Sequence, residues 1–98
     1  MTQEKDKMAE YERAFDANAT TPAEAELKRA RADLMHDLRA FITKNEWTQV
    51  QAARELGVTQ PRISDLMRGK MSKFSIDALI SMAATAGLHF RYQVLESA

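Results

Sequence analysis

The side chains best suited to chemistry lie between residues 49 and 73, and they offer hydrogen bonds and charge. A glutamine amide both donates and accepts, and a guanidinium can donate two parallel hydrogen bonds to one acceptor group. Groups of this kind on one helix face could bind base edges and phosphates; a solvated face is the alternative. The residues concerned are Gln49, Thr59, Gln60, Arg62, Ser64, Asp65, Arg68, Lys70 and Lys73.

Covalent catalysis and metal binding are not expected. The chain has no cysteine, which excludes a disulfide, a thiolate nucleophile and a cysteine zinc site. No nucleophile with a base, phosphate loop or carboxylate dyad has the required spacing. The histidines His36 and His89 are far apart in sequence, without clustered carboxylates beside them. We predict that the protein is not an enzyme and needs no metal or cofactor.

The formal net charge of zero conceals an uneven distribution. Residues 1–27 contain three cations and seven anions, so the remaining chain has an excess of four positive charges. Residues 54–73 contain five cations and two anions. A basic face on a neutral protein is expected where one surface meets phosphate, although charge alone fits a solvated face equally well.

The elements that must position these groups are predicted to be helices. Thr21, Pro22 and Glu24 form a helix start, and the apolar spacing continues to Lys44, with Asn45 as a left-handed stop. We expect the first half of this helix to stand partly in solvent. Apolar residues follow the helical period at Leu27, Leu34, Leu38, Phe41 and Ile42.

Two short helices should follow. Thr48 and Gln51 form a capping box for a helix that ends at Gly57, with Val50, Ala53 and Leu56 as its apolar positions. Thr59 caps a second helix, from Gln60 to about Arg68, with Gly69 after it. Its inward positions are Ile63, Leu66 and Met67.

The C-terminal part should contain one more helix and a strand. Ser75 caps the helix and Gly87 ends it, and Phe74 with Leu79 fits a hydrophobic staple. Residues 88–95 alternate apolar and polar, which predicts a half-buried strand that pairs with the same strand of a second copy. The predicted dimer interface consists of Leu88, Phe90, Arg91, Tyr92 and Val94.

The N-terminal residues 1–20 are predicted to form an acidic helical arm. Met8, Tyr11 and Phe15 make a narrow apolar stripe along it. Such a stripe must dock on this domain, on a second copy or on another protein, because an isolated helix of this length is marginal in water. A dimer arm or a frayed tail is the alternative to a partner-binding helix.

Residues 49–66, QVQAARELGVTQPRISDL, resemble the helix-turn-helix of the Cro and Xre repressor-like superfamily. Ala53 allows close helix approach and Gly57 supplies the unusual backbone of the turn. A wedge that fixes the second helix is formed by Val50, Val58, Ile63 and Leu66. An αα-corner without a ligand explains the apolar positions but not the polar outer face.

The resemblance extends to HigA-type antitoxins, through the RGK-x3-FS-x-D pattern within residues 65–94. About residues 34–95 are covered. The resemblance implies a homodimer that binds double-stranded DNA, represses its own operon and neutralises a RelE/HigB-like ribonuclease toxin. The same core occurs in stand-alone regulators, and the acidic segment has the right charge for a basic toxin.

The resemblance also implies a role for each polar residue. The start of the second short helix enters the major groove, where Gln60 is suited to adenine and Arg62 to guanine or phosphate. Asp65 either accepts from cytosine or pairs with Arg62 or Arg68. Gln49 presents its amide and backbone N–H to a phosphate. Arg68, with Lys70 and Lys73, positions the protein without specifying sequence.

The sequence thus predicts an all-α protein with a repressor-like helix-turn-helix domain of four to five helices. Its parts are an arm at 1–20, the DNA-binding domain at 21–87, and a dimerisation strand with tail at 88–98. We expect a cytoplasmic repressor of a palindromic operator, because neither a signal peptide nor a membrane span is recognisable. The alternatives are a stand-alone phage-type regulator and a protein-interaction module on the same scaffold.

Overall fold

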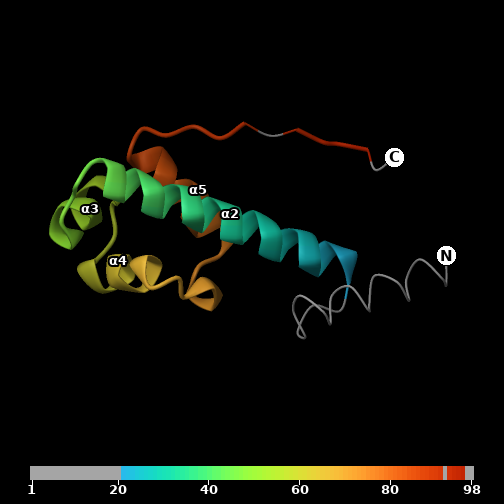
Figure 1. Cartoon of the computed structure of the whole chain (residues 1–98), viewed down its shortest axis with the longest axis horizontal. Coiled ribbons are helices and arrows are strands. Elements are labelled where there is room, and N and C mark those ends of the chain that lie inside the picture. Colours follow the sequence, from blue (N-terminus) through green and yellow to red (C-terminus); the bar gives the residue numbers. More distant parts are fainter. Residues whose placement is uncertain (1–20, 92, 97–98) are drawn as a thin grey trace.

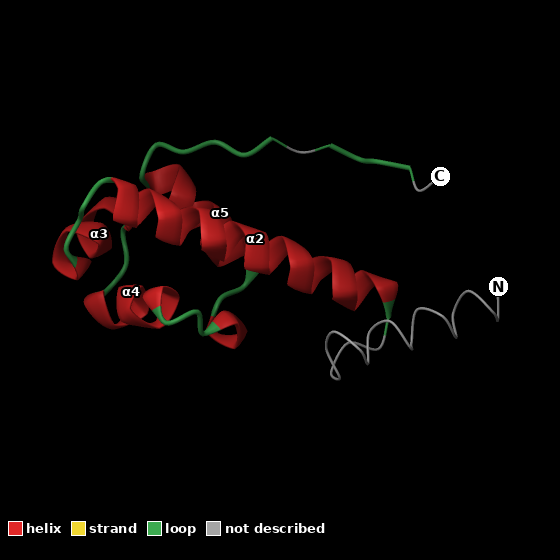
Figure 2. Cartoon of the chain, viewed as in Figure 1, coloured by secondary structure: helices red, strands yellow, loops and turns green. Residues whose placement is uncertain are grey.

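The computed structural model describes residues 21–91 and 93–96. In this part of the chain, four α-helices and one 3-10 helix follow one another (Figures 1 and 2). They are α2 (Pro22–Lys44), α3 (Gln49–Leu56), α4 (Gln60–Met67), η1 (Met71–Lys73) and α5 (Ile76–Thr85). The all-α prediction is confirmed, whereas η1 was not predicted. None of the described helices is long and apolar enough to span a membrane.

Helix α2 begins as predicted but ends differently. Thr21 Oγ1 accepts a hydrogen bond from the Glu24 N–H, and Pro22 occupies the first turn. Asn45 has a right-handed backbone with φ −85°, and the left-handed residue is Glu46 with φ 54°. The Asn45 side chain instead donates to the Phe41 carbonyl at 2.8 Å. The predicted left-handed Asn45 was therefore wrong, because its amide caps the helix and the chain reverses one residue later.

The core lies between the C-terminal half of α2 and the other helices. Met35, Leu38 and Ile42 of α2 are buried, whereas Leu27 in the projecting N-terminal half is 51% exposed (Figure 1). The prediction that this half stands partly in solvent is confirmed. The remaining buried core residues are Ala52, Leu56, Ile63, Leu66, Phe74, Leu79, Met82 and Ala83.

The connection between α3 and α4 has the predicted caps but a different apolar face. The Thr48 and Gln51 capping box is present, and Gly57 is left-handed with φ 72°. Ala52 is fully buried, however, while Val50 is 52% exposed and Ala53 is half-buried. The placement of Val50 in the wedge was wrong. Val50, Ala53 and Leu56 are spaced by three, so they do not share one face of a helix that has 3.6 residues per turn. Ala52 and Leu56 are spaced by four, and both face the core.

Residues 68–75 connect α4 to α5 and bring Phe74 into the core. Gly69 is left-handed with φ 72°, and η1 follows it. Ser75 Oγ then accepts from the Ala78 N–H at the start of α5. Phe74 and Leu79, the predicted staple pair, are both buried. This connection therefore fixes the end of α4 against the core.

The described residues after α5 form an extended segment and no strand (Figure 2). Leu88 and Phe90 are half-buried and pack against the core, whereas Val94 is 98% exposed. The predicted strand is not formed in the single chain, because strand hydrogen bonds need a second backbone. Tyr92 and the predicted arm at 1–20 lie outside the described residues.

Candidate nucleic-acid interface

One side of α4 and the start of α3 form a shallow open groove of about 340 Å³. It is lined by Gln49 of α3 and by Gln60, Pro61 and Ser64 of α4. Thr59 Oγ1 caps α4 by accepting from the Arg62 N–H at 3.4 Å. The structure therefore brings together three polar residues that the sequence singled out, from two helices that the Gly57 turn connects.

These side chains suit the recognition of polar edges. Each glutamine amide both donates and accepts, and the Ser64 hydroxyl does the same. Gln49 occupies the first position of α3, where the helix dipole and unpaired backbone N–H groups favour an anion. Ile63 and Leu66 on the core side of α4 are fully buried, which anchors the helix and leaves Gln60 exposed.

Arg62 lies elsewhere and is engaged within the chain. Its Nη1 donates to the Lys73 carbonyl at 2.7 Å, and its guanidinium lies 4.1 Å from the centroid of the buried Phe74 ring. These contacts tie α4 to the segment around η1, through a charge-assisted hydrogen bond and a cation–π interaction. The predicted contact of Arg62 with guanine or phosphate stays a prediction.

Asp65 forms ion pairs with lysines. Its two carboxylate oxygens lie 3.5 Å from the Nζ atoms of Lys70 and Lys73. The predicted pairing with Arg62 or Arg68 was wrong, because the chain turns at Gly69 and brings these lysines back beside α4. Partial burial alone would raise the pKa of Asp65, but the adjacent Lys73 and Lys70 outweigh it, and the pKa lies below its ordinary value.

Arg68 and Thr59 are exposed at opposite ends of α4. Arg68 has no ion-pair partner among the described residues. Its guanidinium is therefore more accessible to an external anion than that of Arg62. Lys70 and Lys73 are about half exposed and share the single carboxylate of Asp65, so this end of α4 keeps a positive surface.

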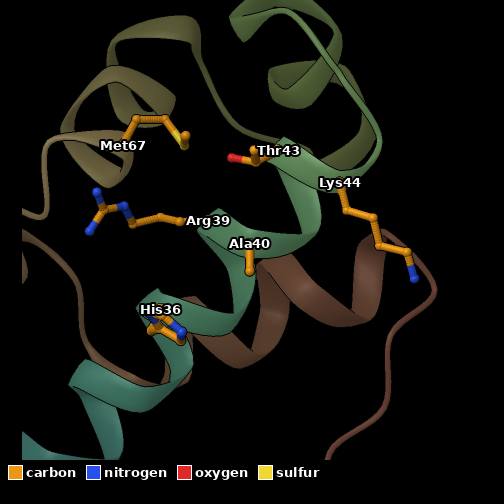
Figure 3. Close-up of a pocket in the computed structure, with 6 residues that line it drawn as sticks. All are labelled: His36, Arg39, Ala40, Thr43, Lys44 and Met67. Atoms are coloured by element: carbon orange, nitrogen blue, oxygen red, sulfur yellow. The ribbon is translucent and has the colours of Figure 1, made fainter.

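A second groove, of about 500 Å³, lies between α2 and the end of α4. Figure 3 shows the residues that line it, and none of them was predicted to bind a ligand. The missed signal is the repetition of polar or charged residues at positions 36, 39 and 43, which share one face of α2. The lining residues are His36, Arg39, Ala40, Thr43, Lys44 and Met67.

The two histidines are separate in the structure. His36 lies on α2 in this groove, and His89 lies in the segment after α5. Within residues 21–91 and 93–96, no group of three or more side chains of the metal-ligating types is found.

Comparison with known families now adds to this geometry. The model of a family described as a helix-turn-helix domain matches residues 19–94. The chain belongs to this helix-turn-helix family. Its first motif helix is α3, the turn is residues 57–59, and α4 is the second or recognition helix, which in such motifs lies in the major groove.

A solved structure supports the same assignment for this helix-turn-helix protein. It is described as an XRE family transcriptional regulator and superposes with a TM-score of 0.69 at 26% sequence identity. The match covers 76% of this chain and 83% of that one. A comparison with curated proteins gives no significant match.

Proposed function

We propose that this helix-turn-helix protein is a sequence-specific DNA-binding transcriptional regulator of the XRE type. The observation that carries the proposal is the groove in which Gln49, Gln60 and Ser64 lie together on the outer side of the motif. The family match and the similarity to an XRE family transcriptional regulator support it. Double-stranded DNA is the proposed ligand and the cytoplasm the proposed location.

Recognition follows from the position of each group. The start of α4 enters the major groove, where the Gln60 amide forms two hydrogen bonds with adenine and Ser64 contacts a neighbouring base. Gln49 binds a phosphate at the start of α3. Arg68, Lys70 and Lys73 bind phosphates at the other end of α4, independently of sequence.

The proposed regulator acts as a homodimer on a palindromic operator. Val94 and Leu95 are exposed in the segment after α5, which supports pairing of this segment with its copy across a two-fold axis. Arg91 and Tyr92 belong to the same proposed interface. Leu88 and Phe90 pack on their own core, so they support the segment and contribute less to the partner. Half-sites should lie about 34 Å apart.

A narrower proposal is that the regulator is an autoregulating antitoxin for a RelE/HigB-like ribonuclease. The resemblance of residues 65–94 and the acidic residues 1–27 support it. Co-purification of the product of the adjacent reading frame with the full chain, but not with a chain lacking residues 1–20, would support this proposal. Absence of such a partner would favour the stand-alone regulator.

A mobility-shift experiment tests DNA binding. The full chain is titrated onto the DNA upstream of its own reading frame, with unrelated DNA as competitor, at 50 and 200 mM salt. We expect specific retention that weakens steeply with salt. Absence of even non-specific binding at the lower salt would contradict the proposal and favour a protein-interaction module.

A further inference from the structure

The groove between α2 and α4 combines cationic side chains with an apolar lining. Arg39 and Lys44 both line it but extend to opposite sides of α2, Lys44 away from Met67, whereas the Thr43 hydroxyl points toward Met67 (Figure 3). Ala40 and Met67 supply the apolar part of the lining. Two cations, a hydroxyl and an apolar surface match a sugar–phosphate chain, whose charged oxygens alternate with apolar sugar faces.

The groove meets α4 on the same side of that helix as the proposed DNA-binding surface. Met67 follows Gln60 and Ser64 at helical spacing, so all three lie along one side of α4. Lys44 is the last residue of α2, and α3 begins at Gln49 shortly after it. A DNA strand that passes Gln49 beside α4 would therefore meet the C-terminal half of α2 next.

The cations of this groove are available to an external anion. Within the described part of the chain, neither Arg39 nor Lys44 forms an ion pair, although Asp33 and Asp37 lie on the same helix. A Cβ built on Gly69 would lie 3.4 Å from Arg39 Nη1. The guanidinium thus lies close to the Gly69 backbone, just after α4.

We propose that this groove binds the sugar–phosphate backbone that flanks the major groove entered by α4. Arg39 and Lys44 each bind phosphate oxygens, Thr43 donates a hydrogen bond to the same strand, and Met67 contacts a deoxyribose. The inference rests on the proposed function and extends the DNA contact beyond the helix-turn-helix motif to α2. An acidic peptide is the competing occupant, but the position of Met67 on the same side of α4 as Gln60 and Ser64 favours DNA.

The test compares variants of the full chain that lack one or two positive charges. Arg39→Ala, Lys44→Ala and the double variant are matched with Arg29→Ala. Arg29 is exposed on the same helix, pairs with Glu26 at 3.0 Å and does not line the groove. Affinity for the upstream DNA and for unrelated DNA is measured at 50 and 200 mM salt by fluorescence anisotropy, and thermal midpoints verify folding.

Each phosphate contact should contribute a factor of about 3.5 to the loss of affinity between these two salt concentrations. We therefore expect this loss to be about 3.5-fold smaller for each single variant than for the wild type, and about 12-fold smaller for the double variant. Arg39→Lys should keep the wild-type salt dependence, and preference for the upstream DNA should be unchanged throughout.

Two results would overturn the inference in distinguishable ways. A double variant with the salt dependence of Arg29→Ala, while the wild type binds DNA tightly, would remove the α2 contact and leave the proposed function intact. If the wild type bound no DNA at either salt concentration, both the α2 contact and the proposed function would be contradicted.

Discussion

The two sides of α4 differ in how their polar side chains are used. On the side that faces η1, Arg62 and Asp65 are held by Lys73, Phe74 and Lys70. On the other side, Gln60 and Ser64 line an open groove with Gln49. The ionic residues within α4 therefore fix its orientation, whereas its neutral polar residues Gln60 and Ser64 stay available to a ligand.

The largest expected effect comes from removing the buried ring of Phe74, against which the Arg62 guanidinium lies. Phe74→Ala should lower the free energy of unfolding by about 3–5 kcal/mol, because a fully buried ring is replaced by a cavity. Urea denaturation measures this change. Val50→Ala is the matched control, and we expect less than about 0.5 kcal/mol because Val50 is half exposed. Equal losses would contradict the assigned core.

Gln60 lies on the side of α4 that lines the groove with Gln49. Gln60→Ala should change the recognition of bases and leave folding intact. Loss of a bidentate contact should relax preference at one base position by about 1–3 kcal/mol. Binding to operators with single-base changes measures this preference. If the variant lost affinity equally for every sequence, Gln60 would not contact a base.

Arg62 within α4 and Arg68 directly after it should separate stability from binding. Arg62→Ala should lower the free energy of unfolding by about 1–2 kcal/mol, since it loses the hydrogen bond to Lys73 and the contact with Phe74. Arg68→Ala should leave stability unchanged and weaken binding to all sequences similarly. Thermal unfolding measures the change in stability, and fluorescence anisotropy measures the change in DNA affinity. A loss of stability in Arg68→Ala, with a loss of DNA affinity alone in Arg62→Ala, would contradict these roles.

The smallest expected effect comes from Asp65→Asn. Removing the carboxylate releases Lys70 and Lys73, so affinity for unrelated DNA should rise by about a factor of 3 and become steeper in salt. Anisotropy at several salt concentrations measures both changes. Unchanged salt dependence would mean that the two lysines do not contact phosphate.

The same variant has a pH signature. Because the pKa of Asp65 is lowered in the folded chain, its ion pairs stabilise the wild type fully above the ordinary value of 3.8. This stabilisation is lost as the pH falls through the lowered pKa. The difference in thermal midpoint between wild type and Asp65→Asn should therefore be constant near neutral pH and shrink below about pH 4.

Local signals made much of the fold predictable. Capping by Thr21, Thr48, Thr59 and Ser75 defines helix starts within a few residues, and Gly57 defines the turn. These signals are short in range, so they do not depend on the rest of the molecule. The positions of Gln49 and Gln60 followed from the same local elements.

Other features depend on contacts between distant segments. The burial of Ala52 in place of Ala53 is decided by how α3 packs against α4 and α5, which spacing alone does not define. The pairing of Asp65 with two lysines requires the path of the chain after Gly69. The strand expected after residue 88 would need a second backbone to pair with, and the described part of the single chain contains no strand.

The most direct test of base recognition by α4 is selection of binding sites from random double-stranded DNA, performed in parallel with the wild type and with Gln60→Ala. We predict that the wild type enriches a palindrome with half-sites about one helical turn apart, and that the variant loses preference at one position in each half-site. Enrichment of the same motif by both proteins, or of no motif by the wild type, would contradict the account.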